Sequence, residues 1–171
     1  GAGLAEALGV AAEVEIHMGT FSKALGSFGA YAAGEDSLIE YLYNRARSFI
    51  YSTALPPAVM GAIQAALKIV AQEPERRQRL LGEAARFREK LQAAGFNTLN
   101  SETQIVPVLV GDNHRALIFA DRLRQAGIMA VAIRPPTVPP GGARIRFSLA
   151  ASHAPEALDW AAQVIIQIGQ E

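Results

Sequence analysis

The sequence predicts an α/β protein whose C-terminal part is a small α+β domain. Segments with the alternating pattern of strands are interspersed with segments in which apolar residues recur at helical spacing. Half of the 171 residues are hydrophobic, which is enough for a sizeable core. Glu73-Pro74 interrupts the helical pattern, so we expect a domain change within 72–76. The predicted domains are 1–73, the end of a larger sheet-containing domain, and 74–171, a small C-terminal domain.

The predicted N-terminal domain begins with two strand patterns. The first alternates apolar and polar residues as a half-buried strand does, and the second consists of small residues and ends at Gly34. In the helix that follows, Leu38, Ile39 and Leu42 are expected to face inward. The expected elements are a strand at 14–18, a strand at 28–34, a helix at about 36–47 and a short extended segment at 49–53.

Two further helices are expected around the predicted domain change. Pro56-Pro57 opens the first, because proline suits a first turn that needs no amide donor. Glu73-Pro74 ends it, and Gly95 is a natural end for the charged amphipathic helix that follows. The apolar positions are Ala62, Ile63, Ala66, Leu67 and Val70 in the first helix, and Leu80, Leu81, Ala84, Phe87 and Leu91 in the second.

From Ser101 onward the pattern is that of a small sheet covered by helices. Asp112 or Asn113 is expected to cap a helix that ends before Gly127. Pro155 begins the last helix, with Leu158, Ala161, Ile165 and Ile168 facing inward. The expected strands are 105–110, 128–133 and 144–149, and 134–142 is a loop rich in proline and glycine.

Composition excludes several functional classes. Lys and Arg number 16, as do Asp and Glu, so bulk charge favours neither a nucleic-acid partner nor an anionic membrane. The absence of cysteine excludes disulfides and thiolate sites, and His17, His114 and His153 lack metal-ligand spacing. The first ten residues do not read as a signal peptide and no segment has the length of a membrane span. We therefore expect a cytoplasmic protein without a metal site.

Thr20-Phe21-Ser22-Lys23 is the first candidate site. Lys23 follows a strand pattern, and glycines follow it directly. A lysine amine forms a Schiff base with an aldehyde cofactor, while small residues let a planar ring and a phosphate approach the backbone. Thr20 supplies a hydroxyl that suits the phosphate. The alternative is an ordinary exposed loop lysine.

Arg144 and Arg146 form the second candidate site. Residues two apart in a strand share one face, so both guanidinium groups point the same way. Together they suit a bidentate clamp for a substrate carboxylate, and the alternative is a solvated charge pair on an edge strand. The stiff loop 134–142 is either a rigid connector or a flap that contacts substrate through Thr137.

Ser52 and Thr53 form the third candidate site. They precede Pro56-Pro57, at the expected start of a helix. Hydroxyl groups there bind an anion, or they serve only as a helix cap or as loop hydroxyls.

These segments together resemble the C-terminal part of the α-oxoamine synthases, a branch of the fold-type I pyridoxal-phosphate (PLP) transferases. The similarity covers essentially the whole chain. It is carried by Thr20-Phe21-Ser22-Lys23 with Gly26, by Ser52-Thr53 with Pro56-Pro57, by 111–113, by 132–139, and by Arg144-Ile145-Arg146. The sequence Arg134-Pro135-Pro136-Thr137 favours the member of this family that makes 8-amino-7-oxononanoate in biotin biosynthesis.

The resemblance implies a fold, a cofactor and a reaction. The chain would comprise the end of the large-domain sheet plus the small domain. Lys23 would hold PLP as a Schiff base and act as general base at the α-carbon of L-alanine. The alanine would condense with a pimeloyl thioester, on CoA or a carrier protein, with loss of CO2. Thr20 would bind the phosphate in the same subunit, and Ser52 and Thr53 would bind the phosphate in the partner subunit of a homodimer. Arg146 would clamp a substrate carboxylate, and Arg144 would support Arg146. Thr137 would contact the substrate.

The family's chain is more than twice as long as this one. The portion without a counterpart here carries a ring-stacking His and the Asp that pairs with the pyridine nitrogen, so we expect the 171 residues alone to be inactive. Two alternatives remain open. One is a sister α-oxoamine synthase such as a glycine C-acetyltransferase. The other is a non-catalytic module that dimerises through apolar faces near 62–70 and leaves Lys23 idle.

Overall fold

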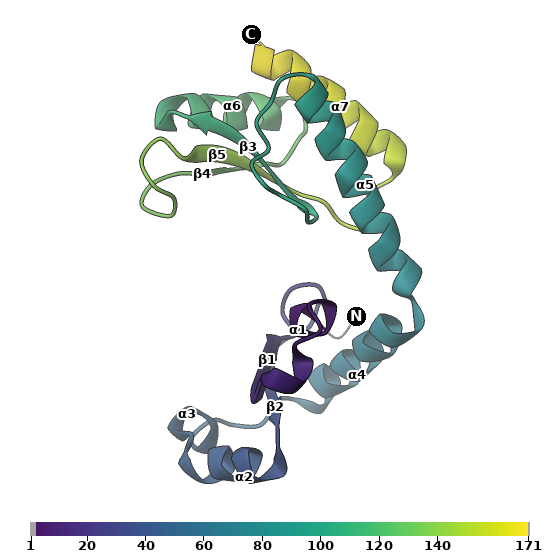
Figure 1. Ribbon diagram of the computed structural model, residues 1–171, viewed down its shortest axis with the longest axis vertical. Helices are drawn as coiled ribbons and strands as arrows, with labels where there is room; N and C mark the ends of the chain where they lie inside the picture. Colours follow the sequence, from purple (N-terminus) through teal and green to yellow (C-terminus); the bar gives the residue numbers. More distant parts are fainter. Residues whose placement is uncertain (1–2, 171) are drawn as a thin grey trace. The chain divides into compact units, whose positions relative to one another are not determined.

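The structure is a computed structural model that describes residues 3–170. The chain falls into two compact units, Gly1–Pro74 and Glu75–Glu171, and each is described by itself (Figure 1). The outermost residues of the two predicted domain ranges, 1–2 and 171, lie outside the described residues. Within residues 3–170, no helix has both the length and the apolar character needed to cross a bilayer.

The first unit contains a two-stranded antiparallel sheet and several helices. Ile16 pairs with Gly34 at one end of the sheet and Thr20 with Ala30 at the other. The elements are α1 (Leu4–Ala7), a 3-10 turn (Ala11–Glu13), β1 (Ile16–Thr20), β2 (Ala30–Gly34), α2 (Asp36–Arg45), α3 (Arg47–Ile50) and α4 (Pro57–Gln72).

Both strands begin two residues later than predicted. The expected strand at 28–34 is shortened because Gly29 has a φ of +96°, outside the β region. The predicted half-burial of the 14–18 face is also wrong for the described residues, since Ile16 and Met18 are 44% and 72% exposed. No element that the structure describes in this unit covers that face, so the apolar residues of the alternating pattern do not pack against a core.

The expected extended segment at 49–53 is wrong. Residues 47–50 form α3, a single helical turn after the extended Ala46. The amides of Phe49 and Ile50 both donate to the Ala46 carbonyl, and the Phe49 ring packs edge-on against Tyr43 at 5.1 Å. These contacts favour a turn over the extended form that the β-branched and aromatic residues indicated.

The helices of the first unit are half-buried along one side. In α2 the less exposed positions include Leu38, Ile39 and Leu42, as predicted. In α4 Ile63 is buried and Ala66 and Val70 are half-buried, whereas Ala62 and Leu67 are exposed, contrary to expectation. The buried stripe runs at intervals of three and four residues from Ile63, so its neighbour Ala62 and the later Leu67 lie off it.

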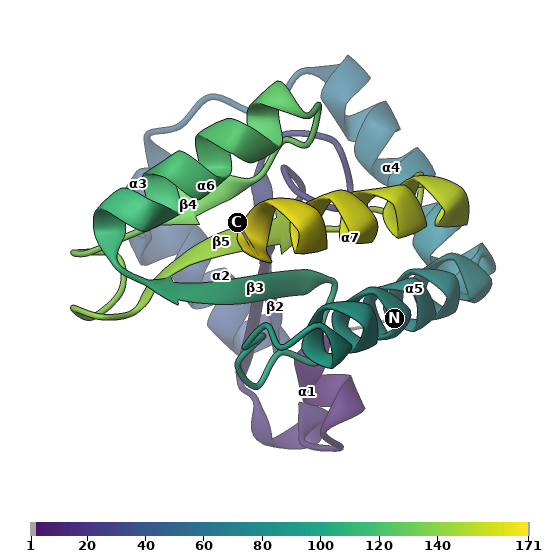
Figure 2. The same ribbon diagram turned by 90° about the horizontal axis from the view of Figure 1, so that it is seen from above.

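The second unit is a three-stranded antiparallel sheet with its helices on one face. The strand order is β3-β5-β4, so β5 is central. Figure 2 shows α5, α6 and α7 lying across the same face of this sheet. The elements are α5 (Pro74–Ala93), β3 (Ile105–Gly111), α6 (Asn113–Gln125), β4 (Val131–Ile133), β5 (Ala143–Ser148) and α7 (Pro155–Gln170).

The core of this unit lies between the sheet and the helices. Strand β5 turns Ala143, Ile145 and Phe147 toward it, and strand β3 contributes Val106 and Val108. Helix α5 buries Ala84, Phe87 and Leu91 as predicted, but Leu81 is 49% exposed. Leu81 lies one residue past the half-buried Leu80, which places it off the inward stripe.

The ends of α6 are set by local chemistry. The Asp112 carboxylate accepts a hydrogen bond from the Arg115 amide at 2.8 Å, so Asp112 is the cap. Gly127 has a φ of +87°, and the Ile128 amide donates to the Leu123 carbonyl. That closure keeps 128–130 out of the sheet, so the strand expected at 128–133 is reduced to Val131–Ile133.

Candidate functional site

A tight loop carries Lys23 between β1 and β2. The Phe21 amide donates to the Gly29 carbonyl at 2.9 Å, and the Ser27 amide donates to the Phe21 carbonyl at 2.8 Å. The Gly26 amide donates to the Lys23 carbonyl at 3.0 Å, with Gly26 at a φ of +59° that suits glycine. These bonds hold the backbone of the loop in one closed conformation.

Aromatic packing anchors the loop to β2. Phe21 is buried, and its ring lies 5.3 Å from that of Tyr31. A Cβ on Gly19 would lie 2.6 Å from the Tyr31 ring, so the strand before the loop has room only for glycine there.

The loop brings two of the predicted site residues together. Lys23 Nζ donates to Thr20 Oγ1 at 3.4 Å, and both side chains are exposed. No atom lies within 4 Å of a Cβ placed on Gly26, so the space beside this glycine of the loop is open. An amine, a hydroxyl and open backbone fit an aldehyde cofactor that carries a phosphate. In residues 3–170 no cluster of three or more His, Asp or Glu side chains suits a metal.

Ser52 and Thr53 lie in an exposed turn between α3 and α4. The Ser52 hydroxyl donates a short hydrogen bond to the Ser48 carbonyl in α3. Helix α4 is preceded by Pro56 and has no side-chain cap, so the helix-cap interpretation of these hydroxyls is wrong. Among the described hydrogen bonds, none joins either hydroxyl to Lys23 or Thr20.

The second unit brings Thr137, Arg144 and Arg146 to one cavity. Its volume is about 540 Å³. It lies on the side of the sheet away from the buried strand residues, and its other lining residues are mostly apolar. They are Leu99, Asn100, Ser101, Thr103, Ile105, Pro107, Ile133 and Val138.

The two arginines lie on the central strand of the sheet. Arg146 is paired with Pro107 on one side and Val131 on the other, and Arg144 is paired with Leu109 and Ile133. The edge-strand interpretation is therefore wrong. Arg144 Nε donates to the Gly142 carbonyl at 2.8 Å, whereas the Arg146 guanidinium makes no hydrogen bond or ion pair with any residue the structure describes.

The segment 97–103 contributes to the cavity and was not singled out from the sequence. Leu99 has a φ of +53°, and the Asn97 carboxamide oxygen accepts its amide at 2.8 Å. The Asn97 carbonyl in turn accepts the Leu109 amide of β3 at 2.9 Å. The sequence does contain a signal for this ordered turn, because Asn, Thr and Ser, which favour turns, recur between Gly95 and the following strand.

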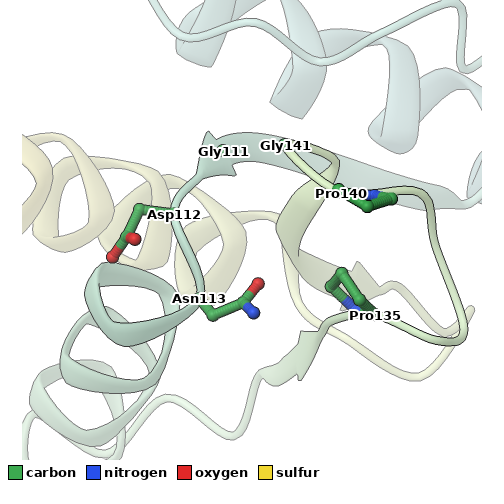
Figure 3. Close-up of a pocket in the computed structure, with 6 residues that line it drawn as sticks. All are labelled: Gly111, Asp112, Asn113, Pro135, Pro140 and Gly141. Atoms are coloured by element: carbon green, nitrogen blue, oxygen red, sulfur yellow. The ribbon is translucent and has the colours of Figure 1, made fainter.

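A smaller hollow of about 280 Å³ lies where β3 meets α6, opposite the loop 134–142. Figure 3 shows the Asn113 carboxamide extending toward the side of Pro135 and Pro140, while the Asp112 carboxylate lies at the start of α6. The Asp112 carboxylate is engaged in capping that helix.

A family model and known protein sequences match this chain. A family model for aminotransferase class I and II matches residues 1–165. A Bacillus cereus (strain Q1) protein with the provisional name 8-amino-7-oxononanoate synthase is 52% identical over 171 residues, which are 100% of this chain and 43% of that protein. The chain thus spans about two fifths of the relative's length.

Solved structures share the fold. A structure of serine palmitoyltransferase (SPT) with a PLP internal aldimine superposes with a TM-score of 0.92 at 27% identity, over 98% of this chain and 43% of that one. The 8-amino-7-oxononanoate synthase from Francisella tularensis superposes with a TM-score of 0.78 at 28% identity, over 91% of this chain and 45% of that one. These neighbours confirm the predicted fold-type I class and PLP as the family's cofactor, and the match over residues 1–165 shows that the chain belongs to the aminotransferase class I and II family.

Proposed function

We propose that the protein containing this chain is an 8-amino-7-oxononanoate synthase. It condenses L-alanine with a pimeloyl thioester, on CoA or a carrier protein, and releases CO2. The observation that carries the proposal is the cavity in which Arg146 and Thr137 meet apolar walls. The 52% identity to a relative that carries the same name supports it.

The first unit supplies the residues that hold the cofactor. When bound, PLP supplies an aldehyde that takes up an amine, and a ring that accepts the electron pair left at the substrate α-carbon. Lys23 Nζ holds the cofactor and removes the proton from the α-carbon of L-alanine. The Thr20 hydroxyl donates a hydrogen bond to the phosphate. Ser52 and Thr53 do the same for the partner subunit of a homodimer.

The second unit supplies the residues that bind substrate. Arg146 donates two parallel N–H groups to a substrate carboxylate, which is the geometry that a guanidinium offers. Thr137 contacts the same substrate from the loop, and Arg144 supports Arg146. The apolar residues Leu99, Ile105 and Val138 line the same cavity and suit the hydrocarbon part of a substrate.

Turnover by the full-length protein tests this proposal. We expect formation of 8-amino-7-oxononanoate and CO2 from L-alanine with pimeloyl-CoA or with a pimeloyl carrier protein. Comparison of the two donors identifies the carrier. A full-length preparation that binds PLP but condenses neither donor with alanine would overturn the assignment. The 171 residues alone are expected to release no CO2 from the same mixture, and a cytoplasmic location also stays a prediction.

The structural neighbours favour one second candidate, a sister α-oxoamine synthase. The TM-score to SPT, 0.92, exceeds the value of 0.78 to the Francisella enzyme. A sister enzyme would prefer glycine or another amino acid and a different acyl thioester. Competition of glycine and L-serine against L-alanine, with acetyl, succinyl and pimeloyl donors, separates the two candidates.

A further inference from the structure

The loop 134–142, here called the flap, is built from two consecutive turns. The Thr137 amide donates to the Arg134 carbonyl at 3.0 Å, and the Gly142 amide donates to the Pro139 carbonyl at 2.9 Å. Thr137 ends the first turn and Val138 follows it, and both residues line the cavity. The position of Thr137 over the cavity therefore depends on both turns keeping their shape.

Arg144 fastens the second turn. Its Nε donates to the Gly142 carbonyl at 2.8 Å, and its side chain is half-buried against the cavity. A Cβ on Gly142 would lie 2.9 Å from the Pro139 carbonyl oxygen and 3.1 Å from Arg144 Nη2. Gly142 is not among the glycines with a left-handed φ, so space rather than backbone conformation requires glycine here.

Gly141, the residue before Gly142 in the same turn, lies beside the end of strand β3. A Cβ on Gly111, which has a φ of +84°, would lie 3.6 Å from the Gly141 carbonyl oxygen. Figure 3 shows Gly111 and Gly141 close together where β3 ends. The second turn thus lies beside the end of β3 and is fastened by the guanidinium of Arg144.

Arg146 contrasts with Arg144. It lies on the same face of β5 and lines the same cavity, yet its guanidinium makes no hydrogen bond or ion pair with a described residue. We infer that Arg144 is a positioning residue that holds the flap through the Gly142 carbonyl, which leaves Arg146 as the cavity arginine that binds the anionic end of the ligand. The ligand's identity rests on the proposed function, but the flap contact does not.

Hydrogen exchange measured by mass spectrometry on the full-length, ligand-free protein tests the flap contact. Lysine keeps the charge of arginine but has a methylene where arginine has Nε, so Arg144→Lys removes this hydrogen bond. We expect the amides of Thr137 and Gly142 to exchange about tenfold faster in Arg144→Lys, the size of one lost hydrogen bond to a charged group. Arg146→Lys and the matched control Arg115→Lys, on the exposed side of α6, are expected to exchange as wild type does.

Gly142→Ala tests the turn that Arg144 fastens, because the new Cβ would crowd the Pro139 carbonyl oxygen and Arg144 Nη2. It is expected to speed flap exchange at least as much as Arg144→Lys does, because it also disturbs the Gly142–Pro139 hydrogen bond. Gly82→Ala, at a helix position with nothing within 4 Å of the new Cβ, is the control for the glycine change. Unchanged exchange in the β3 peptide 105–110 shows that each variant is folded.

Kinetics on the same variants complete the test. Arg146→Lys is expected to raise the KM of the carboxylate substrate at least tenfold without loosening the flap. Arg144→Lys is expected to loosen the flap and to raise KM less. Wild-type flap exchange in Arg144→Lys would overturn the inference. Absence of turnover in the wild-type protein would instead count against the proposed function and leave the exchange result intact.

Discussion

Lys23 Nζ lies 3.4 Å from Thr20 Oγ1, across the first turn of the loop that follows strand β1. The loop is closed by the backbone bonds of Phe21 with Gly29 and Ser27. The amine and the hydroxyl are therefore placed by bonds within the first unit. A cofactor that attaches to one and is bound by the other must use this loop.

Lys23→Ala is expected to abolish covalent attachment of PLP to the full-length protein, because no other amine shares this loop with a hydroxyl. Borohydride reduction followed by peptide mass mapping measures it, with label confined to Lys23 in the wild type. Lys68→Ala, at an exposed position of helix α4, is the control and should leave labelling unchanged. Equal labelling of wild type and Lys23→Ala would favour the non-catalytic module.

Arg146→Ala is expected to lower kcat/KM for the carboxylate substrate by about ten- to a hundredfold. A hydrogen bond to a charged group contributes roughly 1.5–3 kcal/mol, which corresponds to this range. Steady-state kinetics with the full-length protein measures the change, with Arg115→Ala as the surface control. A variant as active as wild type would place the anion elsewhere.

Leu91→Ala is expected to lower the free energy of unfolding by about 3 kcal/mol, because Leu91 is fully buried between α5 and the sheet and its removal leaves a cavity. Leu81→Ala, on the same helix and 49% exposed, is expected to change it far less. Urea unfolding monitored by circular dichroism compares them. Similar losses for the two variants would contradict the observed inward stripe of α5.

The carboxylate of Asp159 on α7 predicts a pH dependence of stability. Its hydrogen bonds from Arg86, then from Lys90, hold the pKa of Asp159 below its usual value. Because the pKa of Asp159 is lower in the folded protein, its ionised carboxylate stabilises the fold at pH values above the unfolded pKa of about 3.9. This stabilisation is lost as the pH falls through the pKa of the folded state.

Asp159→Asn is therefore expected to lower the Tm at pH 7 and to have little effect near pH 2. Thermal unfolding across this range measures the difference. Asp121→Asn, whose partner Arg124 lies on the same helix α6, is the control and should show a smaller effect. A Tm difference between wild type and Asp159→Asn that does not change with pH would contradict this linkage.

Local chemistry made many elements predictable. Pro56-Pro57 and Glu73-Pro74 correctly bounded α4, and Gly127 correctly ended α6, because proline and glycine act on the backbone wherever they stand. The helix at 47–50 could not be predicted, since a single turn depends on packing such as that of Phe49 on Tyr43. Spacing placed Arg144 and Arg146 on one face, but not on a central strand.

The sequence by itself determined the kind of most elements, the family resemblance and the short-range pair of Thr20 with Lys23. These depend on residues a few positions apart, whose geometry the backbone fixes directly. Tertiary structure alone decided that β5 lies between β3 and β4, that Thr137, Arg144 and Arg146 meet one cavity, and that of the two arginines Arg144 donates to a backbone carbonyl. Strand pairing joins residues as far apart as Ile105 and Ser148, and no local pattern in the chain specifies which residues meet.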